Sequence, residues 1–247
     1  MCGRYSLAAP TSQITEAFEI QGELDFETKE MLSHKRYNIA PSQFVPIIIE
    51  NDDNTKIIKK ARFGFIPSWW AHSKETFTKP PLSGTFNARD DKIFQSGYWK
   101  KSIQHHRCLL PASGFYEWEK TSTNAKIPYY FKMKDENKLL ALGGIFSIWK
   151  KPDEYKFIKE DITEICTTAI ITTPANKNTK AIGHERHPFI VEKEFQKKWL
   201  NTGTSEDEIK SIIKPCSCEL MVYYQVSTAV NSTRTDSSEL INEISWK

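Results

Sequence analysis

The sequence lacks the features of a secreted or membrane-embedded protein. Residues 1–20 contain no basic region followed by an apolar run, and no stretch approaches the length that spans a bilayer. Cysteine is sparse, with five residues at uneven spacings. We therefore expect reduced thiols and a cytoplasmic protein, associated with the nucleoid in a bacterium or nuclear in a eukaryote. The cysteines are Cys2, Cys108, Cys166, Cys216 and Cys218.

Metal-binding patterns are also missing. Cys216 and Cys218 are closer together than the usual zinc-binding pair, and no second pair accompanies them. The loop around His184 and His187 differs from a metalloprotease motif, because its histidines are three residues apart rather than four and Pro188 prevents a continuing helix. We predict no bound metal and no cofactor.

A strong excess of charge is absent as well. The chain has 34 Lys and Arg residues against 31 Asp and Glu, a net charge of +3, and its pI is about 8.4. Proteins that bind nucleic acid mainly through charge commonly exceed a pI of about 9. The charge therefore permits a polyanionic partner without requiring one.

No repeat and no linker rich in Gly, Ser or Pro divides the chain, so we predict one domain over residues 1–247. Many strand-like segments and a few separated helices indicate an α+β fold with a mostly antiparallel, barrel-like β-sheet core and peripheral helices. Strands are predicted at 44–50, 56–65, 107–110, 114–119, 128–134, 139–148, 164–173 and 219–226, with an extended segment at 36–41. Helices are predicted at 11–19 with Thr11 or Ser12 as cap, at 92–103, near 192–200, and from a Thr204 or Ser205 cap through Ile213, and residues 174–188 are predicted as a loop.

The possible chemistry begins at Cys2. If Met1 is removed, this residue carries a free α-amine, partly neutral at neutral pH, next to a thiol. Such a 1,2-aminothiol condenses with an aldehyde to an imine, and the thiol then closes on the imine carbon to give a thiazolidine. For a cysteine considered alone, a small residue without a role is the alternative.

Three polar side chains could assist. Asn87 precedes Arg89 in a loop, where the two can orient a sugar hydroxyl and a phosphate, although for these residues taken alone an Asx turn beside a solvated arginine is the favoured interpretation. Strand alternation puts Glu117 on the face of Phe115, where lost hydration suits a general acid or base, and a salt-bridged surface residue is the alternative. His184 follows an apolar strand, a common place for catalytic groups, unless it is a surface or capping residue.

Arginine and tryptophan residues stand near these segments. Arginines combined with aromatic faces are typical of a groove that binds single-stranded nucleic acid. Scattered along a sequence, they are equally compatible with a solvated surface and an aromatic core. The residues are Arg4, Arg89, Arg186, Trp69 and Trp70.

Taken in order, these segments resemble the motifs of the SOS response-associated peptidase (SRAP) family, whose members process abasic sites in DNA. The likeness spans nearly the whole chain, and several long motifs in the same order are more specific than any one alone. The motifs are Met1-Cys2-Gly3-Arg4-Tyr5, Arg36-Tyr37-Asn38-Ile39-Ala40-Pro41, Phe63-Gly64-Phe65-Ile66-Pro67-Ser68-Trp69-Trp70, Phe86-Asn87-Ala88-Arg89, the segment 107–118, and His184-Glu185-Arg186-His187-Pro188, followed by a C-terminal motif in 226–231.

The resemblance implies that Cys2 attacks the ring-opened aldehyde of an abasic site in single-stranded DNA and forms a thiazolidine DNA–protein crosslink. It also implies a role for each remaining candidate. Asn87 would position the opened sugar, Glu117 would serve acid/base chemistry at the imine, His184 would transfer protons in ring opening, closure and reversal, Arg4 and Arg89 would hold phosphates, Trp69 or Trp70 would lie near the splayed bases, and Arg186 is a further DNA contact.

Two positions depart from the family pattern. Asp90 and Asp91 follow Arg89 where many members carry a small residue and then Glu, and His187 replaces the common Met before Pro188. An acidic residue is kept in the first case. The four central residues are unaffected.

Three functions remain to be separated. A DNA-damage (SOS) response protein that crosslinks to abasic sites needs both the amine and the thiol of Cys2. A thiol peptidase or autopeptidase using Cys2 with His184 and Glu117 needs only the thiol. A non-catalytic binder of modified or single-stranded DNA needs neither. We favour the first, and we expect a monomer whose partner is single-stranded DNA containing abasic sites, without a membrane.

Overall fold

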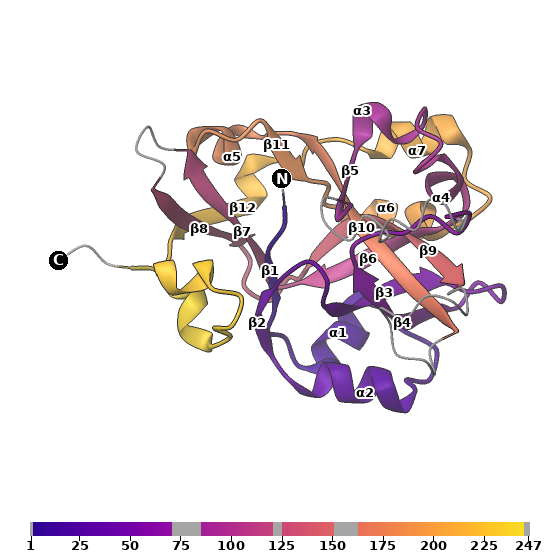
Figure 1. Ribbon diagram of the computed structural model, residues 1–247, viewed down its shortest axis with the longest axis horizontal. Helices are drawn as coiled ribbons and strands as arrows, with labels where there is room; N and C mark the ends of the chain where they lie inside the picture. The colour runs from indigo at the N-terminus through magenta and orange to yellow at the C-terminus, as the bar shows by residue number, and fades with distance from the viewer. Residues whose placement is uncertain (1, 71–84, 121–124, 151–162, 245–247) are drawn as a thin grey trace, which may run out of the picture.

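The computed structural model describes residues 2–70, 85–120, 125–150 and 163–244 (Figure 1). Met1 and residues 71–84 lie outside these residues, and Asn87 and Arg89, which were predicted to lie in a loop, lie in the short strand Asn87–Arg89 because this segment pairs in parallel with residues 170–172. The helices are α1 (Thr11–Phe18), α2 (Phe26–Ser33), α3 (Asp90–Ile93), α4 (Lys100–His105), α5 (Lys177–Ala181), α6 (Lys193–Leu200) and α7 (Glu206–Ile212). The strands are β1 (Tyr5–Leu7), β2 (Arg36–Ile39), β3 (Phe44–Glu50), β4 (Lys56–Phe63), β5 (Asn87–Arg89), β6 (Arg107–Ala112), β7 (Gly114–Lys120), β8 (Lys126–Met133), β9 (Leu140–Lys150), β10 (Glu164–Pro174), β11 (Arg186–Pro188) and β12 (Met221–Gln225).

Five strands close into a barrel. The sheet runs in the order β10-β4-β3-β6-β9, and β9 pairs with β10 again. The hairpin of β3 and β4 is paired from Phe44–Arg62 to Glu50–Lys56, and Asn54 adopts a φ of 56° in its turn. The predicted strands 44–50 and 56–65 are confirmed and form this hairpin, since an apolar segment rich in β-branched residues and a turn-forming Asn/Asp cluster specify it locally.

Strand β10 changes partner along its length. Thr167 and Thr168 pair in parallel with β4, and from Ile170 onward the same edge pairs in parallel with β5. This switch holds the short strand β5 at the rim of the barrel, and β11 pairs with the other edge of β10.

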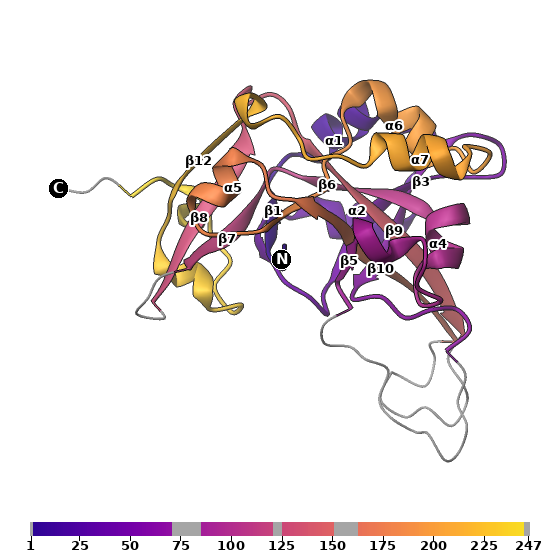
Figure 2. The same cartoon turned by 90° about the horizontal axis from the view of Figure 1, so that it is seen from above.

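A second, fully antiparallel sheet has the order β12-β8-β7-β1-β2. Most pairs in both sheets are antiparallel, which confirms the predicted α+β fold with a barrel-like core. Outside the sheets, α2 packs on β3 and β4, α6 on β6, and α4 on β9. The N-terminal end of the described chain lies between β7 and β5 in both views (Figure 2).

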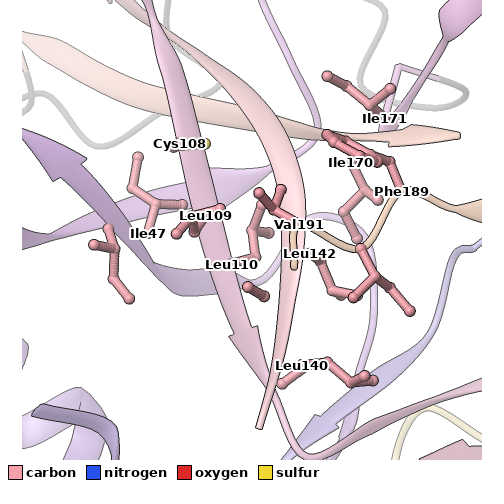
Figure 3. Close-up of a cluster of buried hydrophobic side chains, with 14 of the residues drawn as sticks. Ile47, Cys108, Leu109, Leu110, Leu140, Leu142, Ile170, Ile171, Phe189 and Val191 are labelled. Carbon is pink, nitrogen blue, oxygen red and sulfur yellow. The ribbon is translucent and has the colours of Figure 1, made fainter. Parts of the chain in front are cut away.

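The core joins the two sheets. Figure 3 shows apolar side chains from neighbouring barrel strands meeting inside, among them Ile47, Leu109, Leu142 and Ile170. Each such side chain, when fully buried, contributes about 1.5–3 kcal/mol to stability. Phe115 of the second sheet belongs to the same buried cluster, so the barrel and the second sheet share one core.

The predicted helix caps are confirmed in part. Ser205 caps α7 with a capping box, since its side chain accepts from the Glu208 N–H and the Glu208 carboxylate accepts from the Ser205 N–H. The predicted cap of α1 is wrong, because Pro10 is the N-cap residue and Thr11 is already helical. Proline suits this place because its fixed φ matches the extended conformation of the cap.

Three predictions of local structure need correction. Residues 92–103 form the end of α3 and most of α4 instead of one helix, with a non-helical stretch around Gly97. Helix α2 has no predicted counterpart, since its apolar periodicity is weak and only Thr28 and Leu32 are buried. The predicted loop 174–188 contains α5 and β11, which tertiary pairing with β10 stabilises.

No helix in the described part of the chain is long and apolar enough to cross a membrane.

Candidate active site

Strand β1 brings Cys2 into the interior. Tyr5 pairs with Phe115 of β7, and the N–H of Tyr116 donates to the Arg4 carbonyl at 2.9 Å. The chain preceding β1 therefore runs beside β7 in the direction of Glu117. The Cys2 side chain is fully buried.

Asn87 anchors this segment from the opposite side. Its Nδ2 donates to the carbonyl oxygens of Cys2 at 3.0 Å, Phe86 at 3.0 Å and Ile170 at 3.4 Å. Its Oδ1 is buried and has no hydrogen-bond partner among the described residues. A Cβ atom at Gly3 would lie 3.1 Å from the Phe86 ring, so glycine permits this close approach of the N-terminal segment to β5.

Glu117 faces the same space. Phe115 packs in the main core, whereas Tyr116 and Trp118 belong to a second cluster, so the predicted alternation along β7 is confirmed. The carboxylate is almost fully buried. Burial raises the pKa of the Cys2 thiol, and the nearby Glu117 charge raises that pKa further. The thiol is therefore protonated at neutral pH.

His184 reaches Glu117 from the turn after α5. Gly183 has a φ of 80°, which glycine tolerates, and the His184 N–H donates to the Thr179 carbonyl at 3.1 Å. These features direct the imidazole toward β7. Its Nδ1 lies 3.4 Å from Glu117 Oε2, and its Nε2 lies 2.6 Å from the Trp118 carbonyl oxygen.

The carbonyl of Trp118 selects the tautomer of His184. A carbonyl oxygen only accepts hydrogen bonds, so Nε2 carries the proton and donates. Nδ1 then faces Glu117 and can exchange a proton with it. The two side chains form a unit that can take a proton from a neighbouring group and return it.

The structure therefore brings together the four predicted central residues, Cys2, Asn87, Glu117 and His184, from four separate segments. They place a thiol, an amide, a carboxylate and an imidazole around one point. Within the described ranges, no group of three His, Cys, Asp or Glu side chains could hold a metal ion.

The residues predicted to contact DNA differ in their exposure to solvent. Trp69 is 53% exposed, whereas Trp70 packs against the buried Ile66 and Trp149. Arg89 is exposed and forms an ion pair with Asp91.

The other two residues predicted to contact DNA, Arg4 and Arg186, form hydrogen bonds within the protein. Arg4 Nη1 donates to Asn38 Oδ1 and to the Val230 carbonyl, both at 2.7 Å, and its guanidinium lies 5.5 Å from the Trp118 ring centroid. Burial lowers the pKa of Arg4. Arg186 contacts Asp90 and the Thr172 carbonyl. Their roles toward DNA stay predictions.

The sequence did not single out the groups that support the site. The Trp118 carbonyl has no sequence signature, because every residue has a carbonyl. The sequence indicated Asn38 only as one residue of a family motif. In the structure its Oδ1 accepts from Arg4, and its Nδ2 donates to the carbonyls of Ser232 and Thr235, so it connects Arg4 to the C-terminal segment. The acidic residues after Arg89 did carry a signal, since opposite charges two residues apart can pair.

Comparisons with known proteins give matches over nearly the whole chain. The family model described as SOS response associated peptidase (SRAP) matches residues 1–233. The abasic site processing protein YoqW of Bacillus subtilis is 35% identical over 242 residues, covering 98% of this chain and 99% of that protein. The abasic site processing protein HMCES of Pongo abelii is 28% identical, covering 98% of this chain and 75% of that protein. An X-ray structure of a protein from Bacteroides thetaiotaomicron matches with a TM-score of 0.83 and 28% identity, covering 98% of this chain and 100% of that one.

Proposed function

The chain belongs to the SOS response associated peptidase (SRAP) family, and we propose that it processes abasic sites in DNA as a single SRAP domain spanning residues 1–247. The names of the relatives support this function, and the core shared by both sheets supports the single domain. In this proposal the protein binds single-stranded DNA in the DNA-damage response and crosslinks to the abasic site through Cys2.

The observation that carries the proposal is that an amide, a carboxylate and an imidazole from separate segments all lie around Cys2. Asn87 holds the Cys2 carbonyl at 3.0 Å, and Glu117 lies close enough to the thiol to raise its pKa. His184 Nδ1 lies 3.4 Å from Glu117. A structural cysteine in an apolar core would not require a buried carboxylate and an imidazole beside it, since buried charge is costly unless it is used or paired.

The proposed reaction starts when removal of Met1 frees the α-amine of Cys2. The amine attacks the aldehyde carbon of the opened abasic sugar, and loss of one water leaves an imine. The sulfur then bonds to the same carbon, and its proton is transferred to the imine nitrogen, which gives a thiazolidine. The net change is one new C–N bond, one new C–S bond and one released water.

Glu117 and His184 serve the proton transfers in this scheme. The Cys2 thiol reaches the imine protonated, because burial and the Glu117 charge disfavour its thiolate. Glu117 accepts that proton as sulfur adds, and the Glu117–His184 pair returns a proton to the nitrogen. Reversal of the crosslink uses the same path in the opposite direction.

Asn87 and the exposed residues act in binding. Asn87 retains a buried Oδ1 that can accept from a hydroxyl of the opened sugar. Trp69 offers an exposed ring on which a base can stack, and Arg89 offers a guanidinium for a phosphate. Neither group reads base identity, so binding is expected to be independent of sequence and to weaken with salt.

The proposal is tested by intact mass spectrometry after mixing the protein with a single-stranded oligonucleotide that contains one abasic site. Protein that begins at Cys2 is expected to gain the mass of the oligonucleotide less one water. Protein retaining Met1 and the Cys2→Ala variant are expected to form no thiazolidine. Cys218→Ala is the matched control, because it removes a half-exposed thiol elsewhere and should crosslink like the wild type.

Other outcomes would favour the two competing functions. Absence of an adduct from protein confirmed to begin at Cys2 contradicts the crosslinking proposal. If that protein instead cleaves a peptide in a Cys2-dependent manner, the thiol peptidase is supported. If Cys2→Ala keeps every DNA-dependent property of the wild type, the protein is a non-catalytic binder.

A further inference from the structure

Two consecutive acidic residues each hold one of the arginines predicted to contact DNA. Arg89 donates from Nε to Asp91 Oδ1 at 2.9 Å and from Nη2 to Asp91 Oδ2 at 2.7 Å, which is a two-pronged ion pair. Arg186 donates from Nη2 to Asp90 Oδ1. Both acids lie in the first turn of α3, directly after β5.

The two ion pairs differ in burial. The side chains of Arg186 and Asp90 are 14% and 21% exposed, and Arg186 also binds the carbonyl of Thr172 in β10. This pair ties the segment after Asn87 to the strand that follows His184, so breaking it would disturb the site. The side chains of Arg89 and Asp91 are both 48% exposed, and their ion pair can open without disturbing any packed element.

The Asp91 carboxylate occupies the position on Arg89 that a phosphate would need. A guanidinium binds carboxylate and phosphate in the same forked geometry, so its two aligned N–H groups serve one of them at a time. While the ion pair is closed, it holds Arg89 in one orientation, because Asp91 is part of a helical turn. A DNA strand reaching Arg89 must therefore replace an existing ion pair rather than find an unoccupied cation.

We propose that Asp91 is an internal counterion of Arg89 that competes with the phosphates of the DNA backbone. The protein then binds undamaged strands less tightly than it would with an unpaired Arg89. The inference rests on the proposed function. Phosphate contacts are the same on damaged and undamaged strands, so weakening them shortens the time spent on undamaged DNA. The covalent step at Cys2 then decides where the protein stays.

The expected change in DNA affinity is small because the Arg89–Asp91 ion pair is exposed to solvent. A solvent-exposed ion pair contributes little, so its replacement changes affinity modestly, by about two- to fivefold. Asp90 and Glu185 also carry negative charge toward Arg89 and remain when Asp91 is changed, which keeps the effect small. Salt screens such exposed charges, and the difference is therefore expected to shrink as ionic strength rises.

The test compares Asp91→Asn with Glu136→Gln by measuring the affinity for an undamaged single-stranded oligonucleotide at low and at moderate salt. Glu136 is the matched control, because its carboxylate pairs with Lys132 at 2.6 Å on the surface near the β8–β9 turn and the substitution removes the same charge. Asp91→Asn is expected to bind about two- to fivefold more tightly than the wild type, and more tightly than Glu136→Gln. In an Arg89→Ala background, Asp91→Asn is expected to give no comparable gain.

Two results would overturn the inference. Equal affinities of Asp91→Asn and Glu136→Gln contradict it, and so does an undiminished gain in the Arg89→Ala background, which would indicate general charge repulsion. The crosslinking assay separates this inference from the proposed function. Wild-type protein that crosslinks an abasic strand while Asp91→Asn binds like the control contradicts the counterion role alone, and wild-type protein that forms no adduct contradicts the proposed function.

Discussion

Asn87 donates a hydrogen bond from Nδ2 to the main-chain carbonyl of Cys2 at 3.0 Å. Cys2, the proposed nucleophile, is therefore held by its own backbone, and its position depends on β5 as well as on β1. Because β5 is fixed by parallel pairing with β10, the barrel wall helps to position Cys2.

Asn87→Ala is expected to slow adduct formation with an abasic strand by about 10- to 100-fold, because it removes a buried hydrogen bond that positions Cys2. Single-turnover kinetics measured by denaturing gel electrophoresis provide the check. Asn178→Ala is the control, since Asn178 donates similarly to the Cys218 carbonyl at 3.0 Å away from the site. Equal slowing by both substitutions would indicate general loosening of the fold.

Glu117→Gln and His184→Ala are expected to slow crosslinking or its reversal by about 10²- to 10⁴-fold, the usual contribution of a general acid or base. The affinity for an undamaged strand should stay within about twofold of the wild type, because neither side chain is exposed to DNA phosphates. Exposed His105→Ala is the matched control for the imidazole. If binding falls as far as chemistry in both variants, their roles are structural.

Trp69→Ala is expected to weaken binding of single-stranded DNA by about 5- to 150-fold, since stacking on an aromatic ring contributes about 1–3 kcal/mol per base. The ring is 53% exposed, so stability should change little. Phe26→Ala removes an even more exposed ring on α2 and serves as the control. Fluorescence anisotropy with a labelled oligonucleotide distinguishes the two, and an unchanged affinity in Trp69→Ala would exclude this residue as a stacking platform.

His187 is expected to make the fold sensitive to acid. Burial lowers the pKa of His187 to about 3, whereas an unfolded histidine titrates near 6.5. Between these values only the unfolded chain binds the proton, so stability is complete above about pH 6.5 and is lost as the pH falls toward 3. At pH 5 the loss is about 2 kcal/mol.

The substitution His187→Met should remove this loss, because methionine fills an apolar site without titrating. The measurement is the difference between the thermal unfolding midpoints at pH 7.5 and pH 5, which should be smaller in His187→Met than in the wild type. His34→Met, at an exposed position, should leave that difference unchanged. An identical difference in His187→Met and the wild type would mean that other groups cause the acid sensitivity.

The sequence alone determined the features that depend on neighbours along the chain. The two strands of the β3–β4 hairpin, a helix cap at Thr204 or Ser205, and the side of β7 that carries Glu117 all follow from local composition, alternation and cap chemistry, and the structure confirms them with Ser205 as the cap. The ordered family motifs also predicted which four polar residues meet. Each of the local signals lies within a few residues of the feature it predicts, whereas the family motifs are spread over nearly the whole chain.

Only the tertiary structure decided how those features act on one another. The exchange of β4 for β5 along β10 places Asn87 at Cys2, and the Trp118 carbonyl, 66 residues from His184, sets the tautomer of the imidazole. Strand pairing across long separations depends on the whole arrangement of the barrel, and a main-chain carbonyl is the same at every residue. For that reason the sequence indicated which residues to expect at the site, while the packing of β7, β10 and the turn after α5 determined their positions and the tautomer of His184.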